Sequence, residues 1–68
     1  MERTPVFSSN LVSVGYDGQT QTLEIEFKNG AVYQYSGVPL DEFNAFMNAD
    51  SKGTYFHARI KHFPTTRL

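Results

Sequence analysis

The chain has 68 residues, of which seven are acidic, six are basic and none is cysteine. A chain of this length supports one hydrophobic core and therefore one domain, and the absence of cysteine excludes disulfides and thiolate metal sites. No apolar run is long enough to cross a membrane, and residues 1–10 lack the apolar core of a signal peptide. We therefore expect a soluble, cytoplasmic protein that does not bind membranes.

Three alternating segments predict antiparallel strands, at residues 11–16, 23–27 and 31–36. In the second segment Glu24 and Glu26 alternate with apolar residues, so we expect both carboxylates on the solvent side of the sheet. Residues typical of turns separate the segments, which indicates a meander.

Loop length decides which residues of the first two strands face each other. With residues 17–20 as the loop, Val14 pairs with Leu23 and Val12 pairs with Ile25. This register places all four apolar side chains on one face of the sheet.

The second hairpin has two alternative loops. A two-residue loop would set Glu26 beside Tyr33 and would waste the apolar face of the strand. A three-residue loop of residues 28–30, whose glycine is left-handed, sets Ile25 beside Tyr33 and puts Tyr35 on the same apolar face. We expect the second register, because one face of the sheet must be buried. Both tyrosines then belong to the core face, with their hydroxyls reaching its edge.

Two helices are expected after the third strand. Pro39 suits the first helical position, and Asp41 and Glu42 are favourable in the first turn. Ser51 suits the N-cap of the second helix, and Pro64 ends it. Each helix has an apolar stripe, formed by Leu40, Phe43, Phe46 and Met47 in the first and by Phe56, Ile60 and Phe63 in the second.

The predicted fold class is α+β: a three-stranded antiparallel β-meander followed by two helices packed on one face, in the order β-β-β-α-α. A single domain then covers residues 1–68, with residues 1–5 and 65–68 as loose termini. Because the helices cover one face of the sheet, the opposite face is expected to be solvated.

The charges are distributed unevenly along the chain. Seven acidic residues against Arg3 and Lys28 leave residues 1–50 with a net charge of −5, whereas four cations and no carboxylate leave residues 51–68 with +4. This asymmetry indicates a surface on one side of the molecule that attracts a polyanion.

Several short motifs follow one another along the chain. They are Val14-Gly15-Tyr16-Asp17, Leu23-Glu24-Ile25-Glu26-Phe27, Gly30, Tyr33-Gln34-Tyr35, Val38-Pro39, Ser51-Lys52-Gly53-Thr54-Tyr55-Phe56 and Ile60-Lys61. This ordered set resembles the KTSC domain, which is named for its place at the C-terminus of some lysyl-tRNA synthetases and also occurs as a free-standing small protein. The resemblance covers about residues 11–63. It implies a small non-catalytic domain, and the association with synthetases suggests RNA as its ligand.

The start of the second helix is the best local candidate for a binding site. Its first amides have no partner within the helix and point toward an incoming anion. Ser51 adds a hydroxyl, Lys52 adds a charge, and Gly53 leaves room for close approach. A bound phosphate and an ordinary serine N-cap both explain this pattern.

The candidate RNA-binding surface extends from there along the second helix and into the tail. Its cations would contact phosphates, while tyrosine and histidine would stack on unpaired bases. Arg59 and Lys61 lie about 200 degrees apart around a helix, so they do not form one narrow basic stripe. With few cations available, binding of RNA should be weak and strongly salt-dependent. The complete candidate set is Ser51, Lys52, Gly53, Tyr55, His57, Arg59, Lys61, His62 and Arg67.

Neither a metal nor a cofactor is expected. His57 and His62 are five residues apart, which does not match the i, i+4 spacing with which two histidines bind one metal on a helix. The sequence contains no recognisable arrangement of nucleophile and base, so no enzymatic activity is expected. The alternative to RNA binding is a protein-interaction module, which would use a sheet edge or the aromatic C-terminal surface and would bind no nucleic acid.

Overall fold

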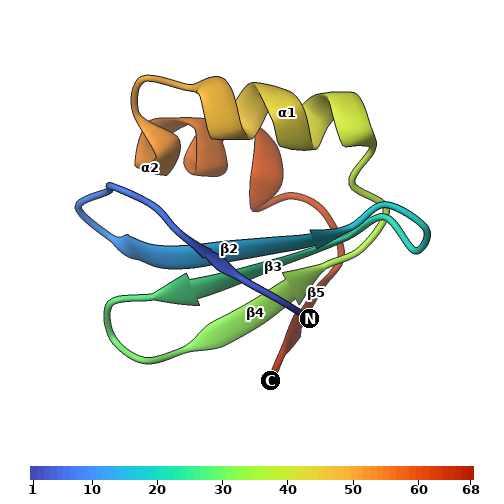
Figure 1. The fold of residues 1–68 in the computed structure, drawn as a ribbon, viewed down its shortest axis with the longest axis horizontal. Helices are drawn as coiled ribbons and strands as arrows, with labels where there is room; N and C mark the ends of the chain where they lie inside the picture. The colour runs from blue at the N-terminus through green and yellow to red at the C-terminus, as the bar shows by residue number, and fades with distance from the viewer.

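One layer of the protein is an antiparallel sheet, and the other consists of helical segments that cover one face of it (Figure 1). The computed structural model describes residues 1–68. The five strands follow one another across the sheet in chain order: β1 (Thr4–Pro5), β2 (Leu11–Asp17), β3 (Thr22–Phe27), β4 (Val32–Tyr35) and β5 (Thr65–Arg67). The helical layer contains α1 (Leu40–Asn48), α2 (Lys52–Tyr55) and η1 (Phe56–Ile60), a π-helical turn that continues α2. None of these helices is long and apolar enough to cross a membrane.

The two ends of the chain form the outer strands of the sheet. The α+β class with helices on one face is confirmed, but the prediction of three strands with loose termini at residues 1–5 and 65–68 is wrong. β1 pairs with β2, and β5 pairs with β4. Beyond β5 the amide of Leu68 still donates to the carbonyl of Val32, at 2.9 Å. The outer strands of a meander present free N–H and C=O groups, and the short terminal segments pair with these groups instead of remaining loose.

The register of β3 and β4 is as predicted. Ile25 lies opposite Tyr33, and the amide of Phe27 donates to the carbonyl of Ala31 at 2.9 Å across the three-residue loop. Gly30 has a φ of 90°, which is the left-handed conformation that this loop requires. The requirement to bury one apolar face was therefore sufficient to choose between the two loops.

The register of β2 and β3 differs from the prediction. Val14 lies opposite Ile25 rather than Leu23. The prediction ended the strand before Asp17, but Asp17 continues β2 and the turn instead ends at Gln21, whose φ of 54° is left-handed. Because the register moves by two residues, Val14 still points toward the core.

A β-bulge at the start of β2 reverses the side-chain direction predicted for Val12. The register shifts between Leu11 and Ser13. Leu11 is buried as a result, whereas Val12 is 37% exposed. Leu11 and Val12 are both apolar, so alternation in the sequence does not reveal which of them faces the core.

The ends of the helices follow their capping residues. Pro39 is the N-cap of α1 rather than its first residue, because its ψ of 157° is extended. Ser51 caps α2 as predicted, and its hydroxyl accepts a hydrogen bond from the amide of Thr54 at 3.2 Å. The amide of Lys61 donates to the carbonyl of Phe56 at 3.0 Å, so the helix predicted to run to Pro64 ends in π-helical winding.

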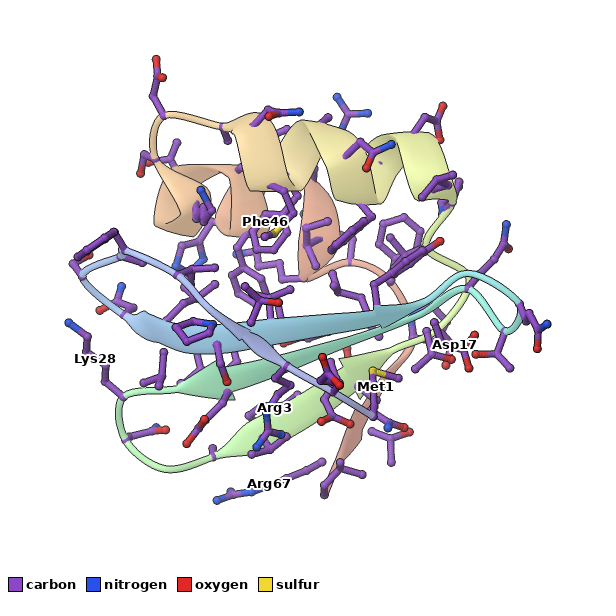
Figure 2. All side chains as sticks on the ribbon, in the orientation of Figure 1. Met1, Arg3, Asp17, Lys28, Phe46 and Arg67 are labelled. Atoms are coloured by element: carbon purple, nitrogen blue, oxygen red, sulfur yellow. The ribbon has the colours of Figure 1, made fainter.

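The core lies between the sheet and the helical layer, and Phe46 projects into it from α1 (Figure 2). Its largest fully buried side chains are Leu11, Leu23, Ile25, Val38, Phe46 and Ile60. At one end of this core the rings of Tyr16 and Phe43 stack with centroids 4.4 Å apart. The hydroxyl of Tyr16 donates to the carbonyl of Val38 at 2.6 Å, which fixes the chain where it leaves the sheet for α1.

The outer face of the sheet is less solvated than predicted. Glu24 is only 5% exposed, so its expected position on a wet face is wrong. The Nη1 atom of Arg3 lies 2.7 Å from Glu24 Oε2, and the side-chain amide of Gln34 donates to Glu24 Oε1 at 2.9 Å. The buried carboxylate is therefore paired and hydrogen-bonded, as burial of a charge requires.

The N-terminal segment covers this part of the outer face. Figure 2 shows Met1 and Arg3 on the far side of β2 from Phe46. The segment approaches the sheet closely at Gly15, where an added Cβ would lie 2.6 Å from the carbonyl oxygen of Glu2. A glycine at this position therefore lets the backbone of residues 1–3 lie against β2.

An aromatic cleft as candidate binding site

The second helical segment is α2 together with η1, residues 52–60. An open cleft of about 670 Å³ lies where the loop between β3 and β4 approaches this segment. We call it the aromatic cleft. Its floor consists of Leu11, Phe27, Tyr33, Tyr35 and Phe56. Its rim consists of Asn10, Lys28, Asn29, Gly53 and His57. The cleft thus combines apolar ring surface with a few polar groups, which is the usual composition of a ligand site.

The four rings of the floor pack edge to face. Phe56 is central to this arrangement, since its centroid lies 5.4 Å from that of Phe27 and 5.5 Å from that of Tyr35. Phe27 in turn packs against Tyr33 at 5.8 Å with an interplanar angle of 76°. Edge-to-face contacts hold aromatic rings in defined orientations. The floor of the cleft is therefore pre-formed.

The rim is held by hydrogen bonds of the backbone. The amide of Lys28 donates to the carbonyl of Asn10 at 2.9 Å, which joins the two loops at this end of the sheet. The side-chain oxygen of Asn29 accepts from the amide of Ala31 at 3.0 Å. The ammonium group of Lys28 forms no ion pair, since every salt bridge involves Arg3 or Arg59. Figure 2 shows Lys28 at the tip of this hairpin, directed away from the sheet.

No carboxylate lines the aromatic cleft, although the chain has seven. The acidic residues Glu24 and Glu26 belong to the opposite face of the sheet, where Arg3 contacts both. Lys28 is thus a cation at the cleft, and no acidic residue lines the cleft beside it. Such an arrangement favours an anionic or phosphate-bearing ligand over a cationic one.

Three of the predicted site residues lie at or beside the cleft. Gly53 and His57 belong to its rim. An added Cβ at Gly53 would have no atom within 4 Å, so this glycine leaves open space at the cleft rather than permitting close packing against the sheet. Arg67 reaches the site through Tyr33, because its guanidinium carbon lies 5.7 Å from the centroid of that ring.

Two other predicted residues have an acidic partner inside the protein. The hydroxyl of Tyr55 donates to the carboxylate of Glu42, and Arg59 Nη2 lies 3.2 Å from Glu42 Oε1. The hydrogen bond to Glu42, followed by burial, raises the pKa of Tyr55 above its usual value. Tyr55 and Arg59 therefore connect the second helical segment to α1. Arg59 is not an unpaired cation, and the Tyr55 ring does not line the cleft.

The remaining predicted residues are distributed around the second helical segment. Ser51 acts as an N-cap, since its hydroxyl accepts from the amide of Thr54. Lys52 is half-buried at the start of α2, and Lys61 is exposed just after η1. His62 lines a separate shallow groove with Arg59. The structure therefore does not bring all nine candidates into one patch.

The sequence-based prediction missed the residues that α2 and the sheet bring together. Lys28 and Asn29 were assigned to turn formation, and Phe27 and Phe56 to the core. The available signal was the predicted loop of residues 28–30, which places a lysine at the end of the sheet nearest to α2. The sequence of the loop does not show that α2 packs beside it.

The fold and the cleft define a small α+β domain with an open aromatic cleft at the edge of its core. The chain belongs to the KTSC domain family, because the family model with that description matches residues 7–63. This finding confirms the resemblance noted from the motifs.

Proteins with similar sequence or structure include both small proteins and large enzymes. An uncharacterized protein of Stutzerimonas stutzeri is 44% identical over 61 residues, which cover 90% of this chain and 86% of that protein. A lysine–tRNA ligase of Trichormus variabilis is 52% identical over 46 residues, which are 68% of this chain but only 8% of the ligase. The crystal structure of a KTSC domain protein from Yersinia pestis superposes with a TM-score of 0.93 at 43% identity and covers 98% of this chain and 96% of that one.

Proposed function

We propose that the protein is a small, non-catalytic RNA-binding domain that takes an unpaired nucleotide into the aromatic cleft. The observation that carries this proposal is the combination of ring surfaces and a rim without carboxylates. Proteins that recognise single-stranded RNA place unpaired bases against aromatic side chains and hold the backbone with cations. The aromatic cleft offers both kinds of group within one site.

The cations around the cleft are few. Lys28 and His57 lie on the rim, and Arg67 lies over the ring of Tyr33. Lys52 precedes the rim residue Gly53 in the chain. Contacts of three or four cations with phosphates give modest affinity that falls with salt.

The lysine–tRNA ligases also support an RNA ligand. Three such ligases are 48% to 52% identical to this chain over 46 residues. Their name associates them with tRNA, and a domain retained within such an enzyme would gain from contact with that substrate. The matched segment is only 8% of each ligase, so the proposal transfers the class of ligand and not the activity.

The proposed RNA site is not the helical surface that the charge pattern suggested. Tyr55 and Arg59 contact Glu42, and an acidic neighbour weakens the attraction of that surface for phosphate. Of the predicted set, Lys52, Gly53, His57 and Arg67 remain in the proposal. The cytoplasmic location stays a prediction.

A second candidate function is binding of a protein segment at the edge of the sheet. The outer edge of β5 has no neighbouring strand, and Leu68, just beyond β5, is 63% exposed. An extended peptide could add to this edge through its backbone. Salt separates the two functions, since backbone pairing with an apolar contact changes little with ionic strength.

The proposal is tested by titrating a labelled single-stranded RNA with the protein at two salt concentrations. For three or four phosphate contacts, affinity should fall by about 20- to 50-fold when salt rises fourfold, for example from about 50 to about 200 mM. Lys28→Glu should weaken binding strongly. Lys61→Glu is the matched control, because it makes the same change in charge outside the cleft.

Two results would contradict the proposal. The first is the absence of RNA binding at low salt. The second is equal weakening by Lys28→Glu and Lys61→Glu, which would move the binding surface back to the second helical segment. If the protein binds a peptide with an affinity that changes neither with the two charge substitutions nor with salt, that result would instead favour peptide binding at the β5 edge.

A further inference from the structure

The four tyrosines differ in what their hydroxyls contact. Tyr16 donates to the carbonyl of Val38, and Tyr55 donates to the carboxylate of Glu42. The hydroxyls of Tyr33 and Tyr35 form no hydrogen bond with any protein group, whereas those of the other two do. The unpaired hydroxyls are therefore those of the two tyrosines that line the aromatic cleft.

The position of Tyr35 shows where its hydroxyl is accessible. The residue is only 3% exposed, yet the protein contains no fully buried side-chain oxygen without a partner. Its hydroxyl must therefore reach accessible surface, and the surface that Tyr35 lines is the cleft. A deeply buried side chain thus presents an unpaired polar atom to this site.

Tyr33 and Tyr35 are two positions apart on β4, so their side chains project from the same face of the sheet, and both line the cleft. Burial, followed by the neighbouring Tyr33, raises the pKa of Tyr35 to about 12. The phenol of Tyr35 is therefore un-ionised at neutral pH. A phenol in this state can donate one hydrogen bond and also accept one.

We propose that the hydroxyls of Tyr33 and Tyr35 form hydrogen bonds with the polar edge of the bound base, so that the cleft discriminates against an apolar ring of the same shape. This inference rests on the proposed function and specifies the chemistry of the ligand. An apolar ring would cover both hydroxyls without giving them partners, and a buried polar group that loses its water and gains no partner opposes binding.

The aromatic rings and the hydroxyls then have separate roles. The half-buried ring of Phe27 supplies contact surface that accepts any flat ring, because stacking depends little on which base is bound. The hydroxyls of Tyr33 and Tyr35 supply the distinction between a nucleobase and an apolar side chain of a protein. The geometry therefore favours RNA over an apolar peptide in this cleft.

The test uses short RNA backbones that have one base at the centre and abasic riboses elsewhere. The central group is uracil, adenine, one of their nonpolar isosteres (difluorobenzene for uracil and methylbenzimidazole for adenine), or none. For at least one of the two bases, the wild-type protein should bind the natural base about 2- to 12-fold more tightly than its isostere, the range expected for one hydrogen bond. Tyr35→Phe should reduce this preference without weakening binding of the isostere.

Two further variants complete the test. Tyr33→Phe should reduce the same preference, and it replaces Tyr35→Phe in the test if that variant does not fold. Tyr16→Phe is the matched control, because it removes a hydroxyl that contacts Val38 outside the cleft, and it should leave the preference unchanged. Circular dichroism establishes that each variant is folded.

The possible failures are distinguishable. Equal binding of both bases and their isosteres by the wild-type protein would overturn this inference and leave the proposed function intact. A preference of undiminished size in both Tyr35→Phe and Tyr33→Phe would also overturn it. If no probe binds, or if the abasic backbone binds as well as the others, both this inference and the proposed site for the base are wrong.

Discussion

The hydroxyl of Tyr55 on α2 donates a hydrogen bond to the carboxylate of Glu42 on α1. Arg59 contacts the other oxygen of the same carboxylate at 3.2 Å. One acidic side chain thus joins the first helix to the second helical segment at the surface of the core. Gly53 and His57 reach the aromatic cleft from the same helical segment.

Tyr55→Phe should destabilise the protein without changing RNA binding. The variant removes a hydrogen bond to a charged group in a half-buried setting, which stabilises the fold by about 1–2 kcal/mol. Denaturant unfolding measures this loss. Because the hydroxyl is already bound to Glu42, affinity for RNA should stay within about twofold of wild type. The same result is expected if the Tyr55 ring stacks on a base, because stacking does not need the hydroxyl.

Tyr55→Leu separates these last two possibilities. It removes the ring, so a large loss of RNA affinity in a folded protein would show that the Tyr55 ring contacts RNA. Retention of affinity would support its role as a connection between the helices. Arg59→Ala is the companion variant, and its effect on stability should be small because Arg59 is exposed.

Local rules predicted one hairpin of the fold and failed on the other. The loop of residues 28–30 has one glycine that tolerates left-handed φ, and the need to bury Ile25 chose the register. In the first hairpin the left-handed residue is Gln21 rather than Gly18, so the turn residues did not mark the end of the loop. The outer strands were missed because segments of two or three residues without an apolar alternation pair only when a neighbouring edge is present.

The candidate site was only partly predictable for a similar reason. Gly53 was predicted because a helix start has a recognisable pattern of sequence, and His57 was predicted as a possible stacking residue farther along the same helix. Lys28 lies 25 positions before Gly53 in the chain, and only the packing of α2 above the sheet brings the two to one cleft. Glu42 cancels part of the charge of the second helical segment, and no property of the sequence identifies that pairing.

Arg3→Ala should destabilise the protein by about 1–3 kcal/mol. Glu24 is 5% exposed, and Arg3 is its cationic partner at 2.7 Å. Loss of one member of such a pair leaves a buried carboxylate with only a neutral donor from Gln34. Thermal or denaturant unfolding measures the change.

Arg3→Ala combined with Glu24→Gln provides the control. The double variant leaves no buried charge, so it should be more stable than Arg3→Ala alone. An Arg3→Ala protein as stable as wild type would show that the N-terminal segment does not cover Glu24 in solution. RNA binding should be unchanged in all of these variants, because both residues lie on the outer face of the sheet.

The protein should lose stability at alkaline pH. The folded protein holds the pKa of Tyr35 at about 12, above the ordinary value of 10.0, mainly because of burial. The raised pKa means that the un-ionised phenol is favoured by folding, so this contribution is complete below about pH 10 and is lost as pH rises toward about 12. Allowing for solvent at the cleft, the free energy of unfolding should fall by about 1–2 kcal/mol over this range.

The alkaline effect is checked by denaturant unfolding together with the ultraviolet absorbance of tyrosinate. Tyr35→Phe should make stability less dependent on pH above about pH 10. Tyr16 and Tyr55 also have raised pKa values, so some dependence should remain in this variant. Ionisation of all four tyrosines together near the ordinary value would contradict the burial of Tyr35.

Gly53→Ala should move stability and RNA affinity in opposite directions. An added Cβ at this position contacts no atom within 4 Å, so the substitution brings no clash, and alanine in a helix is favoured over glycine by about 0.5–1 kcal/mol. The same methyl group projects into open space at the rim of the aromatic cleft and should reduce affinity for a ligand that fills it. Asn44→Ala on the exposed side of α1 is the control, because it also improves helix propensity but lies outside the cleft. If Gly53→Ala binds RNA as tightly as Asn44→Ala does, the bound nucleotide does not contact this part of the rim, and the site must be placed nearer to Lys28 and Tyr33.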